Sequence, residues 1–485
     1  MEFRLHFKTM AMKKVNIIIQ LTIILAIITI ALSSCEKLLE TDLNDRIQND
    51  VAINSTRDLQ LVLNGAYDGL QSGSMLGGNP IIYADLLADE GIIGNEQKLN
   101  RFGKYEIYSM TTSPQITEIA SFWSTGYSAI NRANNVIYAI DNELVDDADF
   151  DIYKDQLKGE ALFIRAVCHF EMVRFFAKPY NVNNPGANTQ PGIPYRMNPS
   201  TDTDSLNLAR NTVEEVYEYI IADLQESKLL LESAGVMSST SLASSMASTA
   251  MLARVCFFMG DYTLASQYSN EVITSSYYEL SEDYADVFTS SGSDYNQEVI
   301  FQIVNISTDN SNSLIDSYNR SKNPLFQTNA DMYNMYDEND IRRVMINKYF
   351  VIYYIKKYDE AVVEGESQPL NRVYIRLAEM HLIRAESNLI AGGPGNSTYA
   401  FDSYNALRER AFGDSYVPET VALNDLLDSI RIERRRELCF EGDRYHNLKR
   451  LQEPLRDGVS WNSDAPIFKI PADEVSGNNL MEQNP

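Results

Sequence analysis

The chain has 485 residues, of which 44% are hydrophobic and 22% are charged, so it can bury a substantial core. This composition excludes a disordered chain, a collagen-like chain and a membrane protein with many spans. The chain carries 41 Lys and Arg residues against 67 Asp and Glu residues, a formal net charge of −26. Such a surface repels phosphate backbones, so nucleic acid is excluded as a partner.

The first 34 residues have the pattern of a secretory signal peptide. Four Lys and Arg residues lie within the first 14 positions, and an uncharged apolar run from Val15 to Leu32 follows them. A run of this length could also span a membrane as a single helix. The next residues, Leu32-Ser33-Ser34-Cys35, resemble the bacterial lipobox, in which small residues precede a Cys that receives a diacylglyceryl group. We therefore expect residues 1–34 to be removed and Cys35 to carry the several acyl chains that stable anchoring needs.

The remaining Cys and His residues give little sign of catalysis. Cys168 and Cys256 lie in apolar helical runs and Cys439 makes the number odd, so we predict buried free thiols. The sequence contains neither H-E-x-x-H nor C-x-x-C. His169 and His381 lie among apolar helical residues, and we expect both to be hydrogen-bonded core side chains.

Most of the chain after the lipobox has helical patterning. Thr212 and Glu215 have the spacing of a capping box, and apolar residues recur behind them at three- and four-residue steps. Residues 160–178 are apolar on nearly all sides, which predicts a helix that is covered on several faces. The pattern also predicts helices at 118–140 and 423–451.

Two segments have the pattern of helix–turn–helix repeat units. Residues 247–273 contain G-D-Y-x-x-A-x-x-Y, which resembles a tetratricopeptide repeat with its turn at Gly260-Asp261. The second unit consists of YIRLAEMHLIRAESNLI, a Gly-rich turn and AFDSYNALRERA. Such repeats cannot bury their apolar faces singly, so we predict a mainly α fold, an α-solenoid of tetratricopeptide-like helix pairs.

Polar and aromatic stretches separate these helices. Residues 76–117 and 303–333 are rich in Gly, Asn, Ser and Tyr, which predicts long loops. EVIFQIV at 298–304 and KYFVIYYIKKY at 348–358 are predicted strands, because β-branched and aromatic residues dominate both runs. The helical scaffold should therefore carry an irregular, loop-rich face and a few short strands.

Several motifs resemble, in the right order, those of the SusD/RagB family of bacterial surface nutrient-binding lipoproteins. They are FWSTGYSAINRANNVI (122–137), KGEALFIRAVCHFEMVRFFAKPY (158–180), GIPY (192–195), YIRLAEMHLIRAE (374–386), SIRIERRRELCFEGDRYHNLKR (429–450) and NNLMEQNP (478–485). The resemblance covers almost all of the chain after Cys35. Asn447 stands where the family usually has Asp, and the sequence stops two residues before the end of the family's closing motif.

The resemblance implies a scaffold of four tetratricopeptide-like units with an irregular face opposite. It also implies a lipid-anchored protein, exposed at the surface of the outer membrane, that binds a glycan and passes it to a SusC-like TonB-dependent transporter. It implies neither catalysis nor a cofactor. Along the sequence we distinguish a signal peptide (1–34), an N-terminal SusD-like region with the tetratricopeptide-like helices (35–300) and a C-terminal SusD/RagB region (301–485).

By the same resemblance, the ligand face draws on the loop before the helix at 118–140 and on the segment after the strand at 298–304. The predicted ligand-binding residues of these two segments are Asn95, Asn100, Arg101, Phe102, Tyr105, Tyr318, Asn319, Arg320 and Phe326. Loop aromatics offer sugars a flat apolar face. Trp123 belongs to a family scaffold motif, so we expect it in the core. Arg101 and Arg320 are unusual on so acidic a chain, and together they would suit an anionic glycan.

The segment 433–444 could also suggest catalysis, because Glu433, Glu437 and Glu441 recur at four-residue steps beside several arginines. Glycosidase carboxylates must flank a sugar in an open cleft, roughly 5–10 Å apart. In so acidic a chain such pairs arise by chance, so we predict a buried ion network that fixes the helix packing.

Metal binding and three other functions stay open at this point. Asp85, Asp89 and Glu90 could ligate a structural calcium ion or merely cap helices. The alternatives to a glycan-binding lipoprotein are a surface peptide-binding lipoprotein of the RagB type, a glycoside hydrolase and a structural repeat adaptor.

Overall fold

The computed structural model describes residues 53–200, 206–310, 313–359, 361–363, 366–392, 395–418 and 422–485. The predicted signal peptide and Cys35 lie outside these residues. The chain from Ile53 to Pro485 forms one compact unit. In the part that is described, no helix combines the length and the apolar character that a membrane crossing requires.

The described unit is mainly helical, as predicted. Its long helices are α3 (Thr56–Gln71), α7 (Thr117–Asp141), α8 (Phe150–Phe176), α9 (Val213–Ser233), α10 (Ser245–Met259), α11 (Tyr262–Thr274), α14 (Leu377–Ala391), α15 (Asn396–Phe412) and α16 (Leu423–Glu437). The shorter ones are α4 (Asn79–Leu87), α5 (Glu96–Leu99), α6 (Lys104–Tyr108), α12 (Leu314–Tyr318), α13 (Ala330–Asn334), α17 (Asp443–Leu451) and α18 (Ala472–Gly477). Five short 3₁₀ helices are also described: η1 (Tyr284–Phe288), η2 (Arg320–Lys322), η3 (Ile341–Met345), η4 (Gly413–Ser415) and η5 (Arg456–Gly458).

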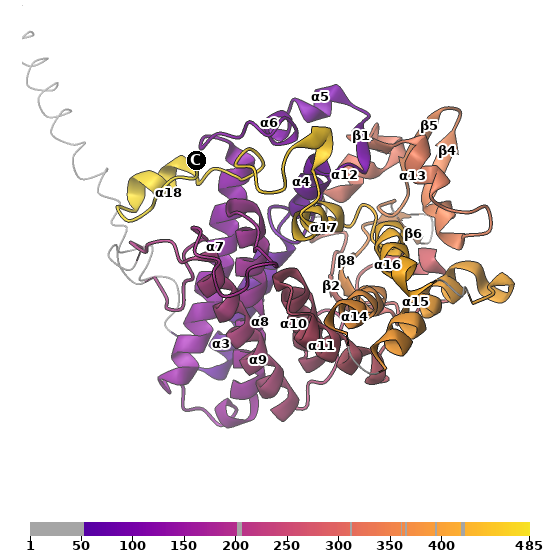
Figure 1. The fold of residues 1–485 in the computed structure, drawn as a ribbon. Helices are drawn as coiled ribbons and strands as arrows, with labels where there is room; N and C mark the ends of the chain where they lie inside the picture. Colours follow the sequence, from indigo (N-terminus) through magenta and orange to yellow (C-terminus); the bar gives the residue numbers. More distant parts are fainter. Residues whose placement is uncertain are drawn as a thin grey trace, which may run out of the picture. The chain divides into compact units, whose positions relative to one another are not determined.

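The long helices pack in chain order, which confirms the predicted solenoid. α7 packs on α3 and on α8, and α9 packs on the other side of α8. α10, α11, α14 and α15 continue the series, each in contact with the one before it. Figure 1 shows α3, α7, α8 and α9 lying alongside one another, with α10 and α11 next to them. Because α8 lies between neighbours, its second half is buried on nearly all sides, as its sequence predicts.

Local signals in the sequence account for several helix ends. Thr212 accepts a hydrogen bond from the Glu215 backbone, and the Glu215 carboxylate accepts one from the Thr212 backbone, so the predicted capping box is present. The turn between α10 and α11 contains Gly260 at φ 79°, and the Asp261 side chain caps α11. The predicted repeat unit at 247–273 is therefore a helix pair.

Three predicted elements are wrong in part. The helix predicted over 423–451 ends at Glu437, because Phe440 and Gly442 adopt positive φ angles of 58° and 78°, and it resumes as α17. The single strand predicted over 348–358 is a hairpin that turns at Phe350, where φ is 54°. The second repeat unit begins as a strand before α14, because its first residues pair with the strand predicted at 298–304.

The strands form three small antiparallel sheets. Strands β1 (Gly91–Ile93), β3 (Phe326–Thr328), β5 (Ile352–Ile355) and β4 (Ile346–Tyr349) form a sheet in that spatial order. β2 (Val299–Ile303) pairs with β8 (Arg372–Arg376), and β6 (Ala361–Val363) pairs with β7 (Glu366–Gln368). β2 is the strand predicted at 298–304, and all five of its residues are buried.

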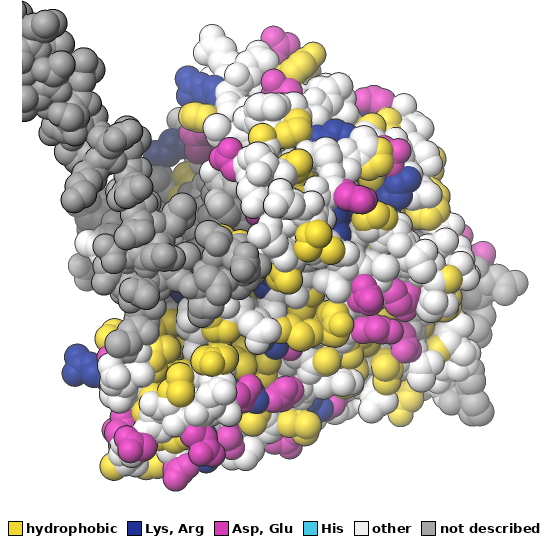
Figure 2. Space-filling view, turned by 90° about the vertical axis from the view of Figure 1, so that its left-hand side faces the viewer, with side chains coloured by type: hydrophobic (Ala, Val, Ile, Leu, Met, Phe, Trp, Pro, Cys, Tyr) yellow, Lys and Arg dark blue, Asp and Glu magenta, His cyan; other side chains and the backbone are white. Residues whose placement is uncertain are grey.

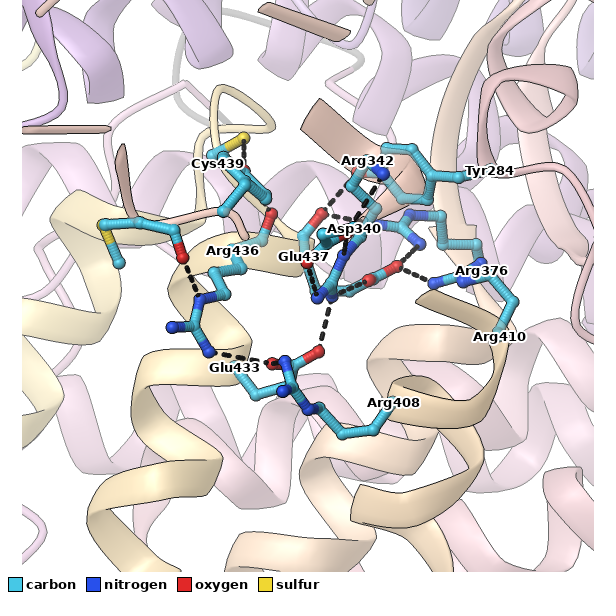
Figure 3. A network of polar contacts seen from close by, with 12 residues as sticks. Tyr284, Asp340, Arg342, Arg376, Arg408, Arg410, Glu433, Arg436, Glu437 and Cys439 are labelled. Carbon is cyan, nitrogen blue, oxygen red and sulfur yellow. Dashed lines mark hydrogen bonds and ion pairs between the residues drawn. The ribbon is translucent and has the colours of Figure 1, made fainter. Parts of the chain in front are cut away.

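A buried ion network ties α16 to three other parts of the chain, as predicted (Figure 3). Arg342 contacts Glu433 at 2.5 Å and Glu437 at 2.8 Å, and both carboxylates are fully buried. Arg376 and Arg410 reach Glu437 at 2.6 and 2.5 Å. Burial alone would raise the pKa of Glu437, but these three arginines outweigh it and hold that pKa well below its usual value.

The predicted core side chains are also buried. Cys168, Cys256 and Cys439 are buried free thiols. Trp123 is buried and its ring N–H donates to Glu474 at 3.1 Å. These positions are therefore structural, as predicted.

The two core histidines differ. His169 is fully buried, its Nδ1 lies 2.8 Å from the Arg165 carbonyl oxygen, and its Nε2 accepts from the Arg196 backbone at 3.2 Å. His381 is buried as well, but its Nδ1 has no hydrogen-bond partner among the described residues. The prediction of a hydrogen-bonded core histidine is therefore confirmed for His169 and wrong for this atom of His381.

A candidate ligand-binding face

The four-stranded sheet joins the two chain segments from which the ligand-binding residues are predicted. β1 belongs to the first segment, whereas β3, β4 and β5 belong to the second. Gly91 pairs with Thr328 and Ile93 pairs with Phe326, although more than 230 positions separate the partners. Figure 1 shows β4 and β5 beside α13 at the upper right of the view and β1 to their left, and β3 lies between β1 and β5 in the sheet. The sheet therefore places both predicted segments in one region of the molecule.

Polar contacts reinforce this junction beyond the end of β1. The Asn95 side chain donates to the Asn323 carbonyl at 3.1 Å and also caps α5 by accepting from the Gln97 and Lys98 backbones. Lys98 pairs with Asp316 at 2.6 Å. Asn95 therefore has a structural role that holds the two segments together.

One face of the sheet is open to solvent. Successive residues of a strand point to opposite sides. In β3, Gln327 is half-buried between two buried residues, and Tyr354 has the same position in β5. Ile92 lies opposite Gln327 and Asn347 lies opposite Tyr354, and both are exposed. We call the surface of Ile92, Gln327, Tyr354, Asn347 and Tyr349 the open face of the sheet.

Arg320 lies over this open face. Its guanidinium carbon is 4.2 Å from the centre of the Tyr349 ring and 5.3 Å from that of the Tyr354 ring. Phe350, at the tip of the hairpin, is 79% exposed and makes an edge-to-face contact with Tyr349 at 4.8 Å. An arginine held on two aromatic rings beside an exposed third ring provides both polar and apolar surface for a ligand.

Three predicted ligand-binding residues face the interior. Tyr318 is fully buried, stacks on Phe326 with ring centres 5.1 Å apart, and donates to Asp85 at 2.5 Å. Phe326 is 1% exposed. Asn319 is buried and accepts from the Ser321 backbone at 2.8 Å, which caps η2. These side chains support the open face from below, so the structure assigns them packing and capping roles.

The other predicted residues are at the surface. Asn100 and Arg101 are exposed at the end of α5, and the rings of Phe102 and Tyr105 are 65% and 51% exposed. Lys104 lies 5.5 Å from the centre of the Phe102 ring. These four residues and Arg320 stay predicted ligand contacts.

Reasoning from the sequence missed the aromatic side chains of the hairpin. Tyr349, Phe350 and Tyr354 lie in the run KYFVIYYIKKY, which indicated a strand but not a site. Five aromatic residues in that run of eleven were the available signal, because a short exposed hairpin cannot bury them all.

The acids considered for calcium are held by protein donors. Asp85 accepts from Tyr318, Asp89 accepts from Arg444 at 2.7 Å, and Glu90 accepts from the Phe440 backbone at 3.2 Å. Burial raises the pKa of Glu90 to about 7. Among the described residues, no three His, Cys, Asp or Glu side chains are grouped so that they could hold a metal ion.

A hollow of 470 Å³ elsewhere on the molecule is lined by residues of α7 and α18 and by Arg196. It contains none of the predicted ligand-binding residues. Among the described residues of its lining, the one aromatic ring is that of Trp123, which is 3% exposed, so they offer a sugar little aromatic surface. The sheet and its loops are therefore the better candidate.

Comparison with known proteins decides the family. Residues 39–257 match a family model described as starch-binding and associating with the outer membrane, and residues 284–466 match the model of the SusD family. The chain belongs to the SusD/RagB family. The predicted family resemblance is thus confirmed over most of the sequence.

Other SusD-like proteins share both sequence and fold with this chain. A SusD-like protein P2 of Formosa agariphila is 26% identical over 89% of this chain and 92% of its own length. The crystal structure of a putative sugar-binding protein from Bacteroides vulgatus superposes with a TM-score of 0.77 at 26% identity, over 90% of this chain and 99% of that one. The surface glycan-binding protein A of Bacteroides thetaiotaomicron, solved with laminarihexaose, has the same fold at a TM-score of 0.69 and 20% identity, over 89% of this chain and 100% of that one. The SusD fold therefore extends over about nine-tenths of the chain.

Proposed function

We propose that this SusD-like protein binds a glycan on the open face of the sheet and on the adjoining loop 100–105. The bound glycan is then delivered to a SusC-like TonB-dependent transporter at the cell surface. The family and the glycan complex of a protein with the same fold support glycan binding. The lipobox-like sequence at Cys35 and the family's description as associated with the outer membrane support a lipid-anchored location there.

One observation carries this proposal. The sheet joins two segments that are far apart in the sequence, and their surfaces display exposed rings at Phe102, Tyr105, Tyr349 and Phe350. Rings of this kind stack on the C–H faces of sugars, and the neighbouring Asn100 can hydrogen-bond to hydroxyl groups. Glu433 and Glu437, the acids considered for catalysis, are buried and bound by arginines, so they do not flank an open cleft as glycosidase carboxylates must. Capture without cleavage is the function that fits this arrangement.

The test is calorimetric titration of the full-length protein, held in detergent micelles, with a panel of oligosaccharides and of peptides. We expect saturable binding of at least one oligosaccharide and no release of cleaved product. The variant Tyr105→Ala should weaken that binding about 5- to 150-fold, because loss of one stacking ring costs about 1–3 kcal/mol.

The matched control is Tyr138→Ala, since Tyr138 is 47% exposed on α7 and Tyr105 is 51% exposed. It should leave the affinity unchanged. Binding of peptides but of no oligosaccharide would show that the ligand is a peptide, as in a RagB-type protein, and would contradict the proposed glycan ligand. Release of shortened sugars would contradict the proposal of passive capture.

A further inference from the structure

The hairpin of β4 and β5 differs in charge from the rest of the chain. Residues 341–358 contain five Lys or Arg residues and no Asp or Glu, although the chain has a net charge of −26. Arg342 and Lys357 are buried and bound by carboxylates, which leaves Arg343, Lys348 and Lys356 as the cations outside the buried network. On the face drawn in Figure 2, by contrast, acidic side chains gather in groups and Lys and Arg are scattered. The cationic hairpin is therefore a local exception, and it coincides with the candidate ligand-binding face.

The charge of Arg320 on the open face is not neutralised by a neighbour. Arg320 is exposed, and the described residues offer it neither an ion pair nor a hydrogen bond from its side chain. By contrast, Arg342, Arg376 and Arg410 each bind at least two carboxylates in the buried network. The charge of Arg320 is thus available to a ligand.

The geometry of Arg320 suits an oxyanion. Its flat face rests on Tyr349 and Tyr354, which restricts the orientation of the side chain. The N–H groups at the edge of the guanidinium remain free, and this planar fork matches the two oxygens of a carboxylate or a sulfate. Because the rings already orient the guanidinium, binding an anion costs less side-chain entropy.

Two further cations lie on the opposite side of the hairpin. Arg343 and Lys348 lie 4.3 and 5.7 Å from the centre of the Tyr333 ring. Neither makes an ion pair within the described part of the chain. β4 is an edge strand of the sheet, so a ligand that crosses the hairpin meets cations on both sides.

We propose that the ligand of this face is an anionic glycan, bearing uronate or sulfate groups, and that Arg320 binds one of these groups. This inference rests on the proposed function and narrows it to one class of glycan. Lys348 and Arg343 attract further anionic groups of the same glycan, while Tyr349 and Phe350 contact its sugar rings. A neutral glycan would leave the charge of Arg320 without a counterpart.

The experiment uses the full-length protein in detergent micelles and pairs of probes that differ only in charge. Galacturonate oligosaccharides are compared with their carboxyl-reduced forms, and chondroitin sulfate oligosaccharides with desulfated ones. We expect one charged member to bind at least 10-fold more tightly than its neutral or less charged partner, and its affinity to fall as the salt concentration rises. A difference in affinity within the galacturonate pair would indicate a uronate group as the ligand of Arg320, and a difference within the chondroitin sulfate pair would indicate a sulfate group.

Substitutions of Arg320 test whether this residue binds the anionic group of the probe. Arg320→Gln should weaken binding of the charged probe about 10- to 100-fold, because it removes a charge-assisted hydrogen bond. Arg320→Lys should recover only part of this loss, because it keeps the charge without the planar fork. The control Lys154→Gln removes an exposed cation on α8, which pairs with Asp151, and should change nothing.

Each other outcome is decisive. If neutral probes bind as tightly as charged ones, the anionic class is wrong while glycan binding stands. If charged probes bind equally well to the wild type and to Arg320→Gln, the assignment of Arg320 is wrong. If no glycan binds, the proposed function and this inference fall together.

Discussion

Arginine and glutamate side chains are buried in the core of this SusD-like protein in numbers that would destabilise it if they were unpaired. Glu437 is fully buried, and three arginines from different segments hold it in its charged form. A buried pair of this kind adds little net stability compared with apolar residues, but it tolerates no missing partner. The spacing of the glutamates in α16 predicted the carboxylate side of the network. Arg342 could not be assigned as a partner from the sequence, because it lies some 90 positions away.

The first prediction concerns Glu437. Glu437→Gln keeps the volume but leaves the surrounding guanidinium groups without a counter-charge, so we expect a loss of about 3–5 kcal/mol in the free energy of unfolding. Urea denaturation followed by circular dichroism measures it. The control Asp151→Asn breaks the exposed pair with Lys154 and should have no measurable effect. Equal stability of both variants would show that the network is not needed for folding.

At the scale of elements, the sequence predicted the helices better than the sheet. α7 and α10 lie close to their predicted bounds, whereas α8 begins ten residues before the segment predicted at 160–178. β1 and β3 are three residues long, so alternation carries almost no information about them, and their pairing depends on contacts between distant segments. For the same reason the family resemblance indicated two segments for the candidate site but not which of their side chains face outward. Tyr318 and Phe326 looked like loop aromatics and are core residues.

The second prediction tests the close packing of two helices. Gly69 of α3 lies against α7, where a Cβ atom at position 69 would come within 2.8 Å of the Ala129 Cβ. Ala129 cannot rotate away, so Gly69→Ala should force α3 from α7 and lower the free energy of unfolding by about 1–3 kcal/mol. Thermal or urea denaturation measures this change.

Gly477→Ala is the matched control, because nothing lies within 4 Å of a Cβ atom at that helical position. It should cause no loss of stability. If Gly69→Ala is equally harmless, the two helices are not packed as closely as the structure shows.

At the scale of the whole molecule, buried histidines make the stability depend on pH. Burial lowers the pKa of His169 and of His381 to about 3, with nearby arginines acting in the same direction, and it lowers the pKa of His446 well below its usual value. The unfolded chain therefore binds more protons than the folded chain between pH 6.5 and about 3, so stability falls as the pH falls through this range. Glu90 acts in the opposite direction, because its pKa is raised to about 7 and the folded state gains its proton first. Burial also raises the pKa of Asp85, Glu118 and Glu160, which act in the same direction as Glu90. The three histidines lower stability on acidification, and these four carboxyl groups oppose them.

The variant His381→Leu isolates one of these groups. It removes a titrating ring whose Nδ1 has no hydrogen-bond partner in the described part of the chain, so the fold should persist at neutral pH. Below pH 6.5 the free energy of unfolding of the wild type should decline more steeply than that of the variant, by up to about 1.4 kcal/mol per pH unit. Urea denaturation at half-unit steps from pH 8 to pH 4.5 measures both curves. Above pH 7.5 the two curves should run parallel, which serves as the internal control. Parallel curves over the whole range would mean that His381 becomes protonated in the folded protein as readily as in the unfolded chain, and that its burial does not govern the acid response.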